Sequence, residues 1–499
     1  MTTECVLAID LGTGGPKVAL VTADGTTLAW SSRPVTTRFI TGGGAEQDPN
    51  EMWTAIVGAT RSALDAARPV PRLVAVAVTS QYMSVVPVTS DGMPTGPCVL
   101  WMDTRGAAHN ASLLTEESLA LFMERHGLIP LPSGSDNIAH IQALRMFHRE
   151  AYESATAFVE PMDYINARLT GRVGATQSTV FGQMVCDNRT WGVTDYDPDL
   201  VAATRLDPHK LAPLLPMNGI VGVVTTAAAA DLGVAEGIPV TTGTIDSITS
   251  AIGTGALTSR DGSVIVGTTS VLVSHIDEHR CDLRAGILAV PSPVAGMYYV
   301  MAENGVGGRA LDWAMRLFGY GDDYAAAVAD AATIGAGADG VQFQPWLLGS
   351  IAPQPSDDVR GGFSGLSLHH DRRHMVRAVM EGVALNLAWL RPAVEAFVGH
   401  DFASLCFGGG AAQSDLWAQM LADALDRPIH QLEEPRATNA RGAAFLAFST
   451  LGMLSLDDVP SLLRIKAVNM PDSANREGMD RALRHLIDLH GALVNLTKL

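Results

Sequence analysis

The sequence predicts an α/β protein made of two similar halves with a cleft between them. Strand-like and helix-like patterns alternate along the chain, which is typical of sheets that helices cover on both faces. Each half also opens in the same way, with two apolar β-like runs joined by a turn rich in Gly and Thr. The first such unit spans residues 5–21 and the second spans residues 263–273. On this feature alone, two unrelated hairpins remain an open alternative.

The composition limits the classes of protein to be considered. The chain has 499 residues, 47% hydrophobic and 17% charged, which excludes a disordered or collagen-like protein and suggests two or more large domains. A formal net charge of −18 argues against a nucleic-acid-binding protein, which would need a basic surface. No targeting segment and no apolar run near the ~20 residues of a membrane-spanning helix is present. Five scattered cysteines without a C-x-x-C pair predict reduced, mostly buried thiols in a cytoplasmic protein.

Several common catalytic motifs are absent from the sequence. None of the lysines is followed by Ser or Thr, so no P-loop is present. None of the 14 histidines is followed by Glu, which excludes the H-E-x-x-H pattern of metalloproteases, and no G-x-S-x-G hydrolase motif occurs. A protein of this sequence that binds a nucleotide must therefore do so with glycines, hydroxyls and carboxylates.

The elements of the first half follow from local signals. After the opening hairpin, Asp48 and Pro49 predict a helix start, with Asp as the N-cap and Pro at the first helical position. Apolar residues then recur at helical spacing. Residues 73–78 predict a buried strand, and residues 239–242 predict a shorter one.

The second half contains a strong βαβ pattern. A strand over residues 404–407 is followed by three glycines at 408–410, a helix over 414–425 and a strand over 428–432. Glycines between a strand and a helix N-terminus let a ligand lie directly on backbone N–H groups. This turn is therefore a candidate nucleotide contact.

Two further turns are candidates for phosphate binding. In the first, Asp10-Leu-Gly-Thr-Gly14, the glycines expose N–H donors, Thr13 adds a hydroxyl, and Asp10 could hold a hydrated Mg²⁺. The second is the turn at residues 267–270. Each turn alone is weak evidence, because an Asp-x-Gly turn is more often a structural hairpin turn. Together with the triple glycine, they predict three separated contacts to one nucleotide.

Two carboxylates are candidates for substrate chemistry. Asp246 lies in a glycine- and hydroxyl-flanked loop after a strand, where it could act as general base for an alcohol. The alternative for Asp246 is a helix N-cap. Asp103 could accept hydrogen bonds from sugar hydroxyls, and its alternative is a local ion pair with Arg105.

A series of short motifs, in a fixed order, is spread over essentially the whole chain. They are Ile9-Asp-Leu-Gly-Thr13 with Lys17, Glu46-Gln-Asp-Pro49 with Trp53, Leu100-Trp-x-Asp-Thr-Arg105, Pro161-Met-Asp-Tyr164 with Leu169-Thr-Gly171, Asp246 with Gly253-Thr-Gly255, Gly305-x-Gly-Gly308 with Trp313, Gly408-Gly-Gly410 with Trp417, and Arg441-Gly-Ala-Ala444. The most specific segment is Gly361-Gly-Phe-Ser-Gly-Leu366, followed after seven residues by His374-Met-Val-Arg-Ala-Val-Met-Glu381. Together these motifs resemble the FGGY carbohydrate kinase family, and within it the xylulokinases most closely.

The resemblance implies a fold and a reaction. The fold is the duplicated actin/hexokinase-like pair of ribonuclease-H-like α/β domains around a central cleft, expected here at residues 1–256 and 257–499. The reaction is phosphorylation of a sugar or polyol hydroxyl by ATP with Mg²⁺, which asks mainly for positioning and charge neutralisation. The expected partner is a small molecule rather than a nucleic acid or a membrane, and the family often forms homodimers.

The resemblance also assigns roles to individual residues. Asp246 corresponds to the general base, Asp10 falls at the carboxylate near the metal and the phosphates, and both are expected Mg²⁺ ligands. The expected contacts to the nucleotide are Gly12, Thr13, Gly14, Lys17, Thr268, Gly305, Gly307, Gly409, Gly410 and Ser414. The expected contacts to the sugar are Gln81, Tyr82, Met83, Asp103 and Asp246.

Departures from the xylulokinase pattern concern the sugar side. The usual Gly-Gln-Met-His-Gly is replaced by residues 80–84, Ser-Gln-Tyr-Met-Ser, so that Met83 stands where a substrate-facing histidine is usual. Met102 replaces an Asn and Ser247 replaces the Asn that commonly follows the base. The first phosphate turn has Gly14 where Ser or Thr is frequent. We therefore expect the catalytic skeleton to be retained and D-xylulose to be a poor substrate.

Two classes of function compete for this sequence. The first is an active kinase for a ketose or polyol. The second is a non-catalytic sugar or nucleotide sensor, or a chaperone-like ATPase, on the same scaffold. A chaperone would need an appended peptide-binding domain, for which no residues remain, and a sensor should have lost the base, whereas Asp246 is present. The sequence therefore favours the kinase.

Overall fold

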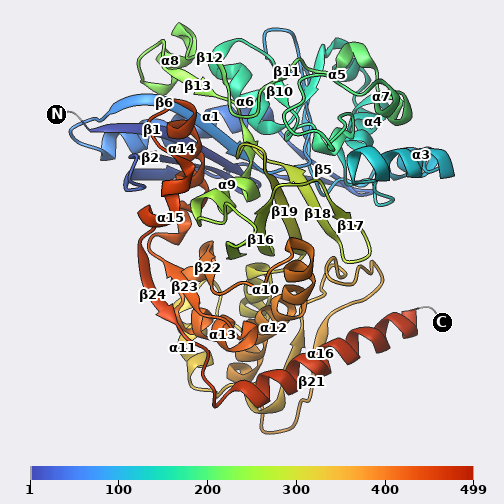
Figure 1. Cartoon of the computed structure of the whole chain (residues 1–499), viewed down its shortest axis with the longest axis vertical. Helices are drawn as coiled ribbons and strands as arrows, with labels where there is room; N and C mark the ends of the chain where they lie inside the picture. The colour runs from blue at the N-terminus through green and yellow to red at the C-terminus, as the bar shows by residue number, and fades with distance from the viewer. Residues whose placement is uncertain (1–2, 498–499) are drawn as a thin grey trace.

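Two mixed β-sheets, one in each half of the chain, form the framework of the structure (Figure 1). The computed structural model describes residues 3–497. The elements of the first half are β1 (Glu4–Gly12), β2 (Gly15–Val21), β3 (Thr27–Ser32), β4 (Arg38–Ile40), β5 (Gly44–Gln47), α1 (Pro49–Ala66), β6 (Arg72–Ser80), β7 (Val86–Val88), β8 (Cys98–Val99), α2 (Ala107–Leu113), α3 (Glu116–Leu121), α4 (Asn137–Phe147), α5 (Arg149–Ser154), β9 (Ala157–Val159), α6 (Pro161–Thr170), β10 (Ala175–Thr176), α7 (Pro198–Thr204), β11 (Leu214–Leu215), β12 (Ile220–Val223), α8 (Thr226–Leu232), β13 (Pro239–Thr241), β14 (Thr244–Ile245) and α9 (Asp246–Gly253). Those of the second half are β15 (Gly262–Val266), β16 (Ser270–Ile276), β17 (Cys281–Asp282), β18 (Ile287–Pro291), β19 (Tyr298–Asn304), α10 (Gly308–Leu317), α11 (Tyr324–Ala332), β20 (Gln342–Gln344), β21 (Gly362–Ser364), α12 (Arg372–Val398), β22 (Leu405–Gly408), α13 (Asp415–Leu425), β23 (Ile429–Leu432), α14 (Thr438–Thr450), α15 (Val459–Leu462), β24 (Ile465–Asn469) and α16 (Arg476–Thr497).

The two sheets share a central topology. The first runs β12-β13-β6-β1-β2-β3, with β14 also on β6, and the second runs β17-β18-β19-β16-β15-β22-β23-β24. In each sheet the opening hairpin is antiparallel, β1 with β2 and β15 with β16, and its first strand pairs in parallel with a later strand, β6 or β22. The predicted duplicated α/β architecture is thus confirmed, and the alternative of two unrelated hairpins is wrong.

Helix α14 belongs to the second half of the sequence but packs on the first sheet. Figure 1 shows it beside β1 and β6. The contact is made mainly by alanines and valines, with one phenylalanine. On the sheet side they are Val6, Ala8, Ala19, Val21, Ala75 and Ala77, and on the helix side Ala440, Ala443, Ala444, Ala447 and Phe448. The predicted boundary near residue 256 stays a prediction, but the first lobe is completed by a helix from beyond it.

Helices α9 and α14 cross at backbone contact. A Cβ atom added at Gly253 would lie 2.1 Å from the carbonyl oxygen of Thr438, and one at Gly442 would lie 1.9 Å from that of Thr249. Real Cβ atoms do not approach an oxygen so closely, so both positions require glycine. This reciprocal contact explains two motifs of the sequence, those containing Gly253 and Gly442, as parts of one junction.

The local predictions match the elements closely. Asp48 is the N-cap of α1, accepting the N–H of Asn50 at 2.8 Å, and Pro49 begins the helix. The predicted βαβ unit corresponds to β22, α13 and β23. All five cysteines are free thiols. Within residues 3–497, no helix has both the length and the apolar character that a membrane crossing requires.

Candidate active site

Three charged residues of the first lobe form the centre of the candidate site. Asp10 lies near the end of β1, is 2% exposed, and pairs across the hairpin with Lys17 of β2. Lys17 Nζ lies 3.5 Å from Asp10 Oδ2. Asp246 begins α9, one residue after β14, which pairs with β6 beside β1. The sheet therefore brings together two carboxylates that are 236 residues apart in the sequence.

Asp246 is not the helix cap that its alternative reading predicts. The N-cap of α9 is Ile245, and Asp246 is the first helical residue. The residue is partly exposed, yet the protein atoms packed around its carboxyl group limit the water that reaches it. Burial, followed by the negative charges of Asp10 and Glu303, raises the pKa of Asp246 to about 7, against the lowering effects of the Ser247 N–H and of Lys17. A carboxylate with a pKa near 7 is matched to proton abstraction at neutral pH.

Glu303 is a charged neighbour that the sequence analysis did not identify. It lies on β19 opposite Val271 of β16, one residue before the end of its strand. Burial raises the pKa of Glu303 to about 7, with Thr269 acting in the opposite direction. Its position at the carboxyl end of a strand, just before the motif that starts at Gly305, was a usable signal, because ligands of α/β sheets bind beyond the carboxyl ends of the strands.

The second lobe brings two glycine turns against one hairpin tip. The tip joins β15 to β16. The Gly307 N–H donates to the Thr268 carbonyl at 3.1 Å, and a Cβ at Gly307 would lie 2.2 Å from the Thr269 oxygen. A Cβ at Gly409, which has φ +85°, would lie 2.7 Å from the Val266 oxygen. The structure thus brings residues 305–308 and 408–410 against the hairpin at residues 266–269. That the turn at Asp10–Gly14, residues 267–270 and the triple glycine contact one nucleotide stays a prediction.

The other glycines predicted to contact the nucleotide have room around them. Gly12 pairs with Gly15 at the tip of the β1–β2 hairpin. Neither Gly14 nor Gly410 has any atom within 4 Å of an added Cβ, and Gly305 meets only the Ile351 side chain, at 3.2 Å. Open backbone of this kind leaves N–H groups accessible to a phosphate.

Thr13 and Gln81 are engaged with each other rather than open to a ligand. The Thr13 hydroxyl donates to Gln81 Oε1 at 2.7 Å and accepts from Trp101 Nε1 at 3.1 Å. Gln81 Nε2 donates to Gln47 Oε1 at 3.1 Å, and Gln47 Nε2 donates to the Thr13 carbonyl at 2.7 Å. This closed ring joins the first phosphate turn to residues 81–84, the predicted sugar loop. A phosphate at Thr13 would therefore bind the backbone N–H of Thr13 or displace the Gln81 side chain.

Asp103 is in the ion pair that its alternative reading predicts. It has no exposed surface, and Arg105 Nη2 lies 2.6 Å from its Oδ2. Arg105 also binds Glu46 at 2.8 Å, and the Ala45 N–H donates to Asp103 Oδ2 at 2.9 Å. A direct contact of Asp103 with a sugar stays a prediction that would require this network to open.

The remaining predicted residues are placed as follows. The Tyr82 hydroxyl is buried without a hydrogen-bond partner in the structure, and burial, followed by the charge of Glu160, raises its pKa well above the usual value. Met83 has a positive φ of 53°. Thr268 is exposed at its hairpin tip. Ser414 is the N-cap of α13, where its hydroxyl accepts the Trp417 N–H at 3.2 Å.

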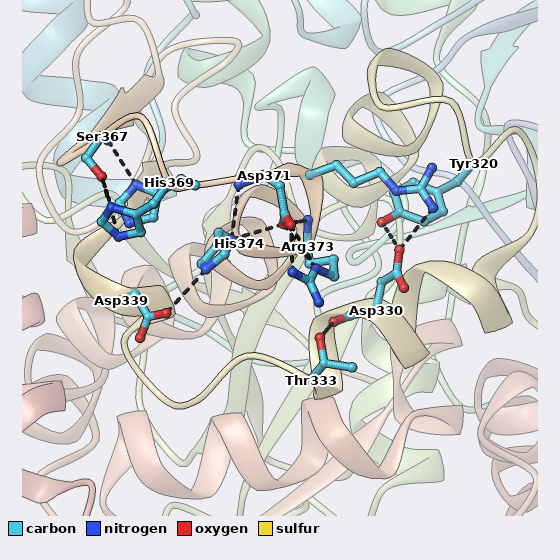
Figure 2. Close-up of polar contacts among 11 residues, drawn as sticks. Tyr320, Asp330, Thr333, Asp339, Ser367, His369, Asp371, Arg373 and His374 are labelled. Atoms are coloured by element: carbon cyan, nitrogen blue, oxygen red, sulfur yellow. Dashed lines mark hydrogen bonds and ion pairs between the residues drawn. The ribbon is translucent and has the colours of Figure 1, made fainter.

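The most specific motif of the sequence builds the start of α12 rather than the carboxylate centre. Figure 2 shows Asp371 and His374 in a reciprocal capping box, with His374 Nε2 3.2 Å from Asp339 Oδ2. One turn further, Arg377 forms a buried ion pair with Glu381 at 2.6 Å. These contacts explain the motif as a structural element of the second lobe.

Comparison with known proteins identifies the family. The family model described as the FGGY family of carbohydrate kinases, N-terminal domain, matches residues 5–253, and the C-terminal domain model matches residues 262–451. The chain belongs to the FGGY family of carbohydrate kinases. As such it is a carbohydrate kinase with the two-domain α/β fold of that family, whose members use ATP as substrate.

The relatives of this FGGY kinase are named for different sugar substrates. A xylulose kinase of Staphylococcus epidermidis is 25% identical over 480 residues, covering 96% of this chain and 94% of the relative. A gluconokinase of Bacillus licheniformis is 25% identical over 514 residues, covering 99% and 97%. The crystal structure of xylulose kinase from Rhodospirillum rubrum superposes with a TM-score of 0.84 at 28% identity, covering 99% and 100% of the two chains. The relatives thus share one family and differ in the sugar for which they are named.

Proposed function

We propose that this protein transfers the γ-phosphoryl group of ATP to a hydroxyl of a ketose or polyol, with Asp246 as general base. The observation that carries this assignment is the placement of Asp246 next to β14 on the sheet that holds Asp10 and Lys17, close enough for both charges and that of Glu303 to act on it. The hydroxyl donates its proton to the Asp246 carboxylate as its oxygen attacks the γ-phosphorus, and the P–O bond to ADP breaks. A positioned base typically accelerates such a step by about 10²–10⁴-fold.

The nucleotide side supplies positioning for this reaction. The open backbone at Gly14, Gly305 and Gly410 can offer N–H groups to the phosphates. The N–H groups of Gly307 and Gly308 are bonded within the lobe and fix its turns, and Lys17 adds a positive charge. Holding the phosphate chain in line with the hydroxyl is the main catalytic demand of phosphoryl transfer.

Asp10 and Asp246 fit the requirements of a Mg²⁺ ion carried by ATP. Within residues 3–497, no group of three or more His, Cys, Asp or Glu side chains could hold a metal ion by itself. Mg²⁺ at kinase sites usually binds through one or two carboxylates, waters and substrate phosphates, so two carboxylates suffice. When bound, the ion would neutralise phosphate charge. A place in the cytoplasm and a homodimeric assembly stay predictions.

The substrate class follows from the composition of the sugar loop. Met83 and Met102 stand where polar side chains are usual in xylulokinases, and a thioether is at best a weak acceptor. A buried hydroxyl left without its partner costs about 1–3 kcal/mol, or roughly 5- to 150-fold in kcat/KM. We therefore propose a ketose or polyol other than D-xylulose. A xylulokinase in which both methionines lie behind the pocket is the second candidate.

A panel of ketoses, polyols and sugar acids assayed for ATP consumption tests both statements. We expect at least one compound to give kcat/KM in the ordinary enzyme range of about 10⁴–10⁸ M⁻¹s⁻¹, with D-xylulose below it. A value near 10⁵ M⁻¹s⁻¹ on D-xylulose would refute the altered specificity but leave the kinase chemistry intact. Sugar binding without turnover of any compound would instead favour a sensor.

A further inference from the structure

Glu160 is an acidic residue that the structure buries beside the sugar loop. It occupies the N-cap position of α6, but its side chain makes no bond to that helix. Glu160 Oε2 instead accepts the Ser84 N–H at 3.0 Å, and Oε1 accepts Asn137 Nδ2 at 2.6 Å. With 1% exposed surface, the carboxyl group is removed from water and depends on these donors.

A short strand pair brings Glu160 to the loop. β7 pairs antiparallel with β9, and Val86 lies opposite Val159. Extending the ladder by one residue places Glu160 beside Val85, within reach of the Ser84 N–H. The register of β7 and β9 therefore places the Glu160 carboxyl group next to the Ser84 N–H.

The loop needs such an anchor because of its backbone conformation. Met83 has φ 53°, the left-handed region that residues with a side chain rarely adopt. The loop is held on both sides of Met83. The Gln81 N–H donates to the Leu11 carbonyl at 2.9 Å, and Ser84 Oγ accepts the Trp101 N–H at 3.2 Å.

We propose that Glu160 is a positioning residue that fixes the backbone of Met83 and Ser84 and thereby sets which sugars are accepted. The inference rests on the proposed function, because residues 81–84 form a sugar loop only if a sugar binds there. Glu160 itself does not touch the substrate. Without its carboxylate, Met83 can leave the left-handed region, and the side chains of Tyr82 and Met83 change direction. Glu160 bonds to Ser84 and Asn137, whereas the first phosphate turn is joined to the loop through the side chain of Gln81. We therefore expect ATP binding to change little.

Hydrogen exchange tests the anchoring without any assay of activity. In Glu160→Gln, one acceptor oxygen is lost while the size of the side chain is kept. We expect amide exchange in a peptide spanning residues 81–84 to become at least tenfold faster, and exchange in β6 to stay unchanged. Glu153→Gln is the matched control, because the Glu153 side chain is 59% exposed and lies in the neighbouring helix α5. Unchanged exchange at residues 81–84 would overturn the proposal.

Kinetics on the best substrate of the panel test the effect on specificity. We expect Glu160→Gln to raise KM for the sugar at least fivefold and to change the preference among sugars, with KM for ATP within twofold of wild type. In a Met83→Gly background the same substitution should have less than a twofold effect, because glycine adopts positive φ without strain. Equal effects in both backgrounds, or faster exchange with unchanged sugar preference, would overturn the proposal and leave Glu160 a core residue.

A second pair of variants keeps the test usable if Glu160→Gln fails to fold. Met83→Ile and Met83→Leu have the same composition, but the β-branched isoleucine resists the left-handed region more strongly. Isoleucine should raise the sugar KM at least threefold more than leucine, and equal values would refute the role of the backbone. If wild type phosphorylates no compound, the proposed function fails, whereas the exchange experiment still supports or overturns the anchoring.

Discussion

The two sides of the candidate active site are built by different means. On the nucleotide side, glycine turns contact one hairpin tip through backbone atoms, as Gly307 does with Thr269. On the sugar side, buried side chains bind one another, as Gln81 does with Thr13 and Asp103 with Arg105. A site built from backbone contacts tolerates no added side chain where the backbones touch, as at Gly307 and Gly409. A site built from side chains can change its specificity while its framework is kept.

The largest expected effect is at the residue between the two sides. Asp246→Asn should lower kcat by about 10²–10⁴-fold, because an amide cannot accept the hydroxyl proton. Calorimetry with a non-hydrolysable ATP analogue should give a Kd within about twofold of wild type, since the glycine turns are untouched. Asp65→Asn, at a carboxylate that is 75% exposed, is the control. More than about a tenth of wild-type kcat in Asp246→Asn would place the base elsewhere.

The next effect concerns the stability of the sugar side. Asp103→Asn should lower the free energy of unfolding by about 3 kcal/mol, the low end for a broken buried ion pair, because Glu46 still pairs with Arg105. Urea unfolding measures this loss. The exposed pair of Asp65 and Arg68 should contribute less than about 1 kcal/mol in the same assay. If Asp103→Asn has the unfolding free energy of wild type but a lower affinity for the sugar, Asp103 contacts the substrate. It would then not be a structural ion-pair residue of the sugar side.

A smaller effect is expected on the nucleotide side. Gly307→Ala should raise the Kd for an ATP analogue about tenfold, because its Cβ would lie 2.2 Å from the Thr269 oxygen and the turn would have to shift. Gly335→Ala is the matched control, since nothing lies within 4 Å of its added Cβ and it lies outside the predicted nucleotide contacts. The sugar KM should change little in either variant. Equal effects on ATP binding at the two positions would contradict the assignment of Gly307 to the contact at the hairpin tip.

The smallest effect is a dependence on pH. Because the pKa of Asp246 is raised to about 7 and the base acts ionised, kcat/KM should fall about threefold between pH 7.5 and 6.5. The raised pKa also means that the folded protein binds this proton more tightly than the unfolded chain. Relative to Asp246→Asn, wild type should therefore lose stability as pH rises from 4 toward 7. A flat rate profile over this range would show that Asp246 is ionised well below pH 7 in the working enzyme.

The framework and the nucleotide turns could be predicted from the sequence because their signals are local. A Pro at a helix start, an alternation of strands and helices, and glycines between a strand and a helix each act within a few residues. The duplication could be predicted from a local signal too, because each half opens with a similar hairpin pattern. The structure confirms the duplicated framework, and it places the glycine turns at residues 305–308 and 408–410 against the β15–β16 hairpin.

The sugar side could not be predicted in the same detail. For Asp103 the sequence left two interpretations open, a sugar contact or an ion pair with Arg105. The ring that joins Thr13 to Gln81 depends on Gln47, a tertiary contact that no sequence spacing reveals. Glu303 was missed because its neighbour in space, Asp246, is distant in the sequence and belongs to the other lobe. Such contacts become visible only when both sheets are in place.

The helix that completes the first lobe also limits how the protein can be dissected. A fragment ending near residue 256 would lack α14, whose alanine face covers one side of the first sheet. That fragment would present a bare apolar surface to water, a hazard for aggregation. The C-terminal half expressed alone would carry a small-residue helix with no sheet to receive it. The two sequence halves are therefore not two independently expressible proteins, and work on isolated lobes would require α14 to be grafted onto the first half.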